Sequence, residues 1–226
     1  MNLWQSYLNA YSSIPHRCEK PWGLISEPID TVSNIAIFIS AYFIFKLLKE
    51  NKLGRNLKFR VFAVLVLSLG IGSTIYHAFH SPYTAIADLL PIYIFVFYSL
   101  YLFLSLITKN KMLQYGIPGL LFILQVAFRA GSLPLFVMNM PTFHIFNVFF
   151  ILALSLWGYK KIGNAIIGIF PILIAYAIGI FIRSFDLVIC SVNGIGTHFL
   201  WHICVAFAIY YTARFLINLS NKKLNL

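Results

Sequence analysis

Long apolar runs separated by short polar connections constrain this chain more than any other feature of its sequence. Seven stretches are apolar over about the 20 residues that an α-helix needs to cross a bilayer. They cover residues 29–49, 59–80, 86–107, 112–128, 142–159, 163–183 and 197–218. The fourth stretch is the shortest and contains Gly116, Pro118 and Gly119. Because no repeat or linker divides the chain, we predict an all-α integral membrane bundle of seven transmembrane helices, with residues 1–226 as a single domain.

The composition agrees with a membrane location. Hydrophobic residues make up 60% of the 226 residues and charged residues only 10%, whereas a soluble domain carries about 25% charged residues. The chain therefore has too few charged side chains to cover a water-exposed surface. Its net charge of +11 is spread between the apolar runs and not gathered on one face, as it is in nucleic-acid-binding proteins. We expect the protein to lie in a lipid bilayer and to bind no nucleic acid.

The positions of the basic residues predict the orientation, because Lys and Arg stay on the cytoplasmic side of a membrane. Thirteen of the 17 basic residues lie on the side that contains the connection between the first two spans and the C-terminus. The other side has four: Arg17, Lys20, Arg129 and Arg183. We therefore place the N-terminus outside and the C-terminus in the cytoplasm. The expected location is the cell membrane in a bacterium, or an ER- or Golgi-type membrane in a eukaryote.

Several polar side chains lie inside the predicted spans, where ionisable groups are costly and are usually functional or paired. Ser73 and His77 are four residues apart near the end of the second span. His198 and His202 have the same spacing at the start of the seventh, and Asp88 lies near the start of the third. Residues four apart share one face of a helix. Since the second span runs outward and the other two run inward, all five residues should meet at one depth near the outer surface.

This combination of residues is typical of a metal site. Two imidazoles at positions i and i+4 can bind one ion from a single helix, and a third histidine with an oxygen ligand would complete a tetrahedral zinc site. Zinc lowers the pKa of water, which then becomes a nucleophile for ester or amide hydrolysis. His80 is an alternative to His77 as the third histidine, although the helical face that His77 shares with Ser73 favours His77.

The motifs around these residues resemble those of the alkaline ceramidases, within the superfamily of seven-helix membrane hydrolases that also includes the progestin and adiponectin receptors. The shared motifs are HRCEKPW, EPIDTVSN, GIGSTIYH, a D-x-L-P sequence that begins at Asp88, and HFLWH, in this order over nearly the whole chain. The resemblance implies hydrolysis of ceramide or a related N-acyl lipid to a sphingoid base and a free fatty acid.

The resemblance also implies a role for each polar residue. His77, His198 and His202 would bind Zn²⁺. Asp88 would orient the attacking water and transfer its proton, and Ser73 would donate a hydrogen bond to the developing oxyanion, whose charge grows only in the transition state.

Members of the family have an N-terminal calcium site, for which the resemblance implies Glu19 and Glu27 as Ca²⁺ ligands. In the family an Asp precedes the first glutamate by three positions and an Asn follows it by two, whereas this chain has His16 and Pro21 there. Calcium takes about six to eight oxygen ligands, so the two remaining carboxylates are a reduced donor set. The alternative for Glu19 is a solvated acid beside its basic neighbours.

Two cysteines precede spans on the predicted outer side of the membrane, where disulfides form. Cys18 lies before the first span and Cys190 before the seventh. The family resemblance supports a bridge between them, which would tie the N-terminal segment to the loop that leads to the last two histidines. Cys204 lies inside the seventh span and is expected to be a packing residue.

Two other functions remain open from the sequence. A seven-helix lipid receptor would keep zinc in a closed structural site with four protein ligands. A proton-coupled transporter would use Asp88 and the histidines as a relay and would bind no metal. Among hydrolase substrates, ceramide rests on analogy: the abundance of Ile, Lys, Asn and Phe suits a bacterial chain, whose substrate could be another N-acyl lipid or a host sphingolipid.

Overall fold

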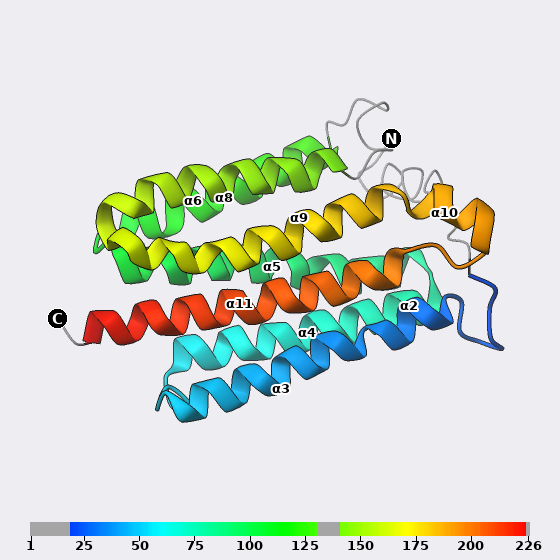
Figure 1. The fold of residues 1–226 in the computed structure, drawn as a ribbon, viewed down its shortest axis with the longest axis horizontal. Coiled ribbons are helices and arrows are strands. Elements are labelled where there is room, and N and C mark those ends of the chain that lie inside the picture. The colour runs from blue at the N-terminus through cyan, green and yellow to red at the C-terminus, as the bar shows by residue number, and fades with distance from the viewer. Residues whose placement is uncertain (1–18, 131–140, 225–226) are drawn as a thin grey trace.

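The computed structural model describes residues 19–130 and 141–224. This part of the chain is helical and contains no β-strand, apart from a single antiparallel bridge between Trp22 and Ile25. The long helices lie side by side along one common direction (Figure 1). The predicted all-α fold is therefore confirmed.

The helices follow the predicted spans closely. In chain order they are α2 (Pro28–Ser33), α3 (Ile35–Glu50), α4 (Leu57–Phe79), α5 (Pro82–Ile107), α6 (Lys111–Ala130), α8 (Pro141–Ile162), the 3₁₀ segment η1 (Gly163–Ile169), α9 (Phe170–Ser184), α10 (Asp186–Asn193) and α11 (His198–Leu224).

Five stretches of the described residues are long and apolar enough to cross a membrane. They are Pro28–Glu50, Leu57–Phe79, Pro82–Ile107, Phe150–Ser184 and His198–Lys222. The fourth of these is not one straight helix, because α8 ends at a turn where Gly163 has a φ of +55°. The chain then folds back through η1, so that α9 lies alongside α8 (Figure 1). An integral membrane bundle follows from these helices, and the full set of seven crossings stays a prediction.

The turn between α4 and α5 is closed by local signals that the sequence contains. His80 ends α4 in the left-handed conformation, with a φ of 38°. Ser81 and Thr84 form a reciprocal capping box, in which each hydroxyl oxygen accepts the backbone N–H of the other residue, and Pro82 begins α5. These features stop one helix and start the next within three residues. The last turn of α4 therefore lies beside the first turns of α5.

An apolar core fills the half of the bundle that lies away from this turn. Its most deeply buried side chains include Ile44 of α3, Phe62 of α4, Leu102 of α5 and Leu216 of α11. Many large apolar side chains on the outside of the bundle are exposed, as expected of helices that face lipid. The polar residues singled out in the sequence lie in the other half, beyond the core.

Candidate metal centre

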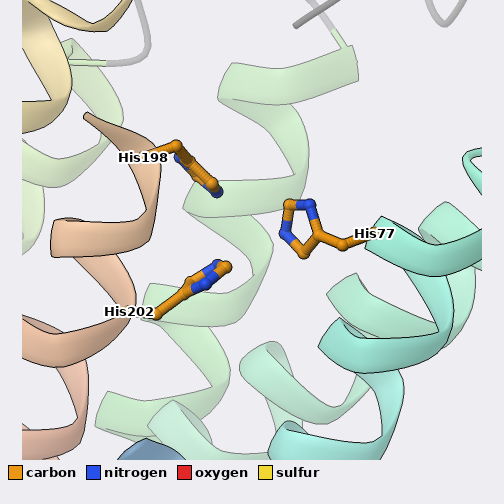
Figure 2. A group of neighbouring side chains, drawn as sticks. All are labelled: His77, His198 and His202. Atoms are coloured by element: carbon orange, nitrogen blue, oxygen red, sulfur yellow. The ribbon is translucent and has the colours of Figure 1, made fainter. Parts of the chain in front are cut away.

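Three buried histidines converge between α4 and α11. His77 comes from the last turn of α4, and His198 and His202 come from the first two turns of α11. Figure 2 shows the three rings pointing toward one another, and their centroids are 4.7 to 5.1 Å apart. Each side chain is almost fully shielded from solvent, with exposed fractions of 1, 3 and 4%. Their ring nitrogens lie close enough together to hold one metal ion.

The predicted meeting of the second and seventh spans at one depth is confirmed by this cluster. The spacing of four residues places His198 and His202 on one face of α11, opposite the end of α4. His80 lies elsewhere: it caps α4, its ring stacks on Tyr76, and its Nε2 is 3.5 Å from a carboxylate oxygen of Glu27. Of the two candidate histidines on α4, His77 is the one that joins the other two rings.

Glu27 holds the ring of His77. Its Oε2 is 2.5 Å from Nδ1 of His77, and both side chains are buried. The backbone N–H of Glu27 also donates to the carbonyl oxygen of His77 at 3.0 Å, so the two residues are joined twice. An ionised carboxylate only accepts hydrogen bonds, so with Glu27 ionised Nδ1 of His77 is the donor. The lone pair of the ring is then on Nε2, where a metal can bind.

Ser33 holds the ring of His202 in the same way. Its hydroxyl oxygen is 2.7 Å from Nδ1 of His202. The hydroxyl donates its own hydrogen to the carbonyl oxygen of Asp30 at 2.8 Å, so toward the imidazole it acts as the acceptor. Nδ1 of His202 is then the donor, and its Nε2 carries the lone pair. Partners of this kind orient the histidine ligands of metal ions and raise their basicity.

Asp30 adds a second buried acid beside the cluster. Only 2% of its surface is exposed, and its Oδ2 is 3.8 Å from Nδ1 of His77. With Glu27 it places two carboxylates in a region from which water is excluded, which favours a cation there. Our sequence reasoning did not single out Asp30 or Ser33. Asp30 follows Glu27 by three residues and Ser33 follows Asp30 by three, so consecutive members are about one helical turn apart, and this spacing is the signal that could have identified them.

Glu19 is a buried helix cap and not a solvated acid. Its two carboxylate oxygens accept the backbone N–H groups of Ile29 and Asp30, at 2.5 and 2.9 Å, at the start of α2. Acidic groups at this end of a helix pair with its unbonded amides and with its dipole. The alternative of a solvated side chain is wrong, since Glu19 is 8% exposed. The calcium role expected for Glu19 and Glu27 stays a prediction from the family resemblance.

Ser73 and Asp88 lie on either side of a close contact between α4 and α5. Ser73 is buried one turn before His77, and Asp88 is half-buried in the second turn of α5. Between them Gly72 lies directly against the backbone of α5, where an added Cβ would be 2.1 Å from the carbonyl oxygen of Ala87 and 3.3 Å from Cα of Asp88. The turn that carries Asp88 is thereby held against the turn that carries Ser73. The catalytic roles of the two residues stay predictions.

Arg183 is a further charged residue at the cluster that our sequence reasoning used only to count charges. It lies in the last turn of α9, and its Nη1 is 3.0 Å from Nδ1 and 3.4 Å from Nε2 of His198. Its guanidinium group lies over the ring of Trp201, 5.3 Å from the centroid. The signal for it was present in the sequence, since a basic residue within an apolar span is costly.

The cysteines give less information. Cys18 lies outside the described residues, so the predicted bridge to Cys190 of α10 stays a prediction. Cys204 is a free, half-buried thiol of α11, and it packs near Gly179 of α9, where an added Cβ would be 3.0 Å from the Cβ of Cys204.

The described helices form an integral membrane bundle that encloses three buried imidazoles and two carboxylates, side chains that could hold a metal ion. Imidazole nitrogens are donors that zinc prefers, so the residues present fit this metal. The sequence matches the family model for ceramidases over residues 17–225, and the chain belongs to the ceramidase family. No match was found among curated proteins. Membership of this family makes the protein a membrane hydrolase that acts on amide bonds of a lipid.

Proposed function

We propose that the protein is a zinc-dependent amidase that hydrolyses ceramide or a related N-acyl lipid to a sphingoid base and a free fatty acid. One observation supports this proposal above the others. Two of the three converging imidazoles have their Nδ1 atoms engaged by Glu27 and Ser33, which leaves their Nε2 atoms to bind a metal. A cluster that served only for packing would not need this control of the histidine tautomers.

His77, His198 and His202 would bind the zinc. When bound, zinc supplies Lewis acidity, which activates water for attack and polarises the amide carbonyl. In the hydrolysis, the oxygen of water adds to the carbonyl carbon, the bond from that carbon to nitrogen breaks, and the nitrogen takes up a proton.

Asp88 and Ser73 would carry out the proton transfer and the charge stabilisation. The carboxylate of Asp88 accepts a proton from the attacking water and passes it to the leaving nitrogen. The hydroxyl of Ser73 donates to the oxygen that becomes negatively charged as the carbonyl carbon turns tetrahedral. The contact of Gly72 with the backbone of Ala87 supports these roles, because it brings the two turns that carry Ser73 and Asp88 together.

The setting in the membrane follows from the predicted orientation. With the N-terminus outside, the histidines lie near the outer surface, where the amide of a membrane lipid is found. The acyl chain would extend between helices toward the bilayer centre. A disulfide between Cys18 and Cys190 would hold the N-terminal segment against the loop before α11.

A seven-helix receptor with a structural zinc is the alternative, and one experiment separates the two functions. The protein is purified in detergent, its zinc content is measured, and release of fatty acid from a fluorescent ceramide is followed with and without a chelator. The hydrolase predicts about one zinc per chain and activity that the chelator abolishes. Zinc without turnover of any N-acyl lipid would favour the receptor, and a protein without zinc would contradict both.

A further inference from the structure

The histidine cluster has an acidic side and a basic side. Glu27 and Asp30 of α2 lie beside His77, whereas Arg183 of α9 lies beside His198. Helices α2 and α9 both pack against α11 (Figure 1). A lipid held at the cluster therefore meets carboxylates toward α2 and a guanidinium group toward α9.

The position of Arg183 suits contact with a bound molecule. Its Nη1 is 3.0 Å from Nδ1 and 3.4 Å from Nε2 of His198, so the guanidinium group lies against the ring that we propose as a metal ligand. A donor placed there can reach an oxygen atom held at the cluster.

The guanidinium group is also held in place. It lies over the ring of Trp201, and such a cation–π contact is favourable in a site with little water. Trp201 in turn packs against Gly179 of α9, where an added Cβ would be 2.9 Å from the indole ring. Gly179 lies four residues before Arg183 and therefore on the same face of α9. The indole ring can thus lie flat on α9 below the guanidinium group.

We propose that Arg183 binds the carboxylate of the long-chain fatty acid at the histidine cluster. This inference rests on the proposed function, because hydrolysis converts the carbonyl carbon of the amide into a carboxylate carbon at that place. A guanidinium group presents parallel N–H donors that match the two oxygens of a carboxylate. The acidic residues on the α2 side repel a carboxylate and attract an amine, so the two products separate to opposite sides of the cluster.

Binding can be tested without catalysis. Radiolabelled oleic acid is titrated onto the full-length protein in detergent, both as purified and after chelation, and oleyl alcohol of the same chain length is used as a competitor. We expect the acid to bind more tightly than the alcohol in both preparations. Arg183→Gln should weaken binding of the acid by about 10- to 100-fold, the usual loss for a hydrogen bond to a charged group, and leave the alcohol unchanged. Arg183→Lys keeps the charge without the planar group, so its affinity for the acid should lie between those of the wild-type protein and Arg183→Gln.

Arg214→Gln is the matched control, because Arg214 is an exposed arginine at the other end of α11. It should bind the acid as the wild-type protein does. The inference is overturned if wild-type protein binds acid and alcohol equally, or if Arg183→Gln keeps the preference for the acid. N-oleoylglycine, whose carboxylate belongs to a head group, is titrated in the same way. The inference is also overturned if Arg183→Gln weakens binding of N-oleoylglycine but not of oleic acid. Failure of the proposed hydrolysis would be seen separately, as absence of fatty-acid release from ceramide.

Discussion

Gly72 of α4 lies against the carbonyl oxygen of Ala87 of α5 so closely that an added Cβ would be 2.1 Å from it. No rotation of a side chain can relieve such a contact, because the obstructing atoms belong to the backbone. The two helices can keep this spacing only while position 72 has no side chain.

Gly72→Ala should therefore separate α4 from α5 at the level of Asp88. We expect kcat for lipid hydrolysis to fall by about 10²-fold, since a displacement near 1 Å can cost that much, while zinc content is retained because all three histidines lie outside α5. Gly119→Ala is the control: nothing lies within 4 Å of its added Cβ, and activity should be unchanged. Wild-type activity in Gly72→Ala would show that the spacing of the helices does not position Asp88.

Glu27→Gln removes the buried charge that faces Nδ1 of His77. We expect zinc affinity to fall by about 10- to 100-fold, as is typical when the partner of a metal-bound histidine is lost. The measurement is competition with a chelator of known affinity, on protein that is still folded by circular dichroism. Glu50→Gln, the same change at an exposed position at the end of α3, should leave the affinity unchanged. Equal affinities for the two variants would contradict the role given to Glu27.

Ser33→Ala removes the acceptor for Nδ1 of His202 and should also lower zinc affinity, by about tenfold or more. The removed group is a single hydroxyl, so the melting temperature of the chelated protein should change little. Ser191→Ala, which removes an exposed hydroxyl bonded within α10, serves as the comparison. If Ser33→Ala lowers stability but leaves zinc affinity as it was, the hydroxyl serves packing and not the metal.

Asp88→Asn should separate zinc binding from catalysis. The amide cannot take up the proton of water, so we expect activity to fall by about 10²- to 10⁴-fold with zinc content unchanged. His202→Ala should lose both zinc and activity, because it removes a ligand. Metal analysis and fatty-acid release on the same preparations test both statements. Loss of zinc from Asp88→Asn would instead make Asp88 a ligand.

His77→Ala and His80→Ala distinguish the two histidines at the end of α4. The ring of His77 lies 5.1 and 4.8 Å from those of His198 and His202, whereas His80 stacks on Tyr76. We expect His77→Ala to abolish zinc binding and His80→Ala to preserve it. The reverse result, measured by metal analysis of the two purified variants, would show that His80 is the ligand.

The features that the sequence predicted best are those that depend on a single helix. Hydropathy located the spans, and the spacing of four residues placed His198 and His202 on one face. The direction of each span then brought His77 to the same depth. These inferences need only helical geometry and the thickness of a bilayer.

The sequence did not predict contacts that depend on which helices lie next to each other. Ser33 and Asp30 act at the cluster because α2 packs on both α4 and α11, and Arg183 does so because α9 packs on α11. Neighbours around a bundle are set by side-chain packing, for which one sequence carries no periodic signal. The role of Gly72 was not predicted either, because it depends on the backbone of α5 that lies opposite this position.

The bond between Ser33 and His202 joins residues 169 positions apart. The ribosome therefore synthesises α2 long before the first turn of α11, so the early helices enter the membrane before the histidines of α11 are made. A nascent chain would bring all three histidines together only after α11 has inserted. The proposed metal site would thus be completed only once α11 is in place, and a chain truncated before α11 would lack both the site and the activity that we propose.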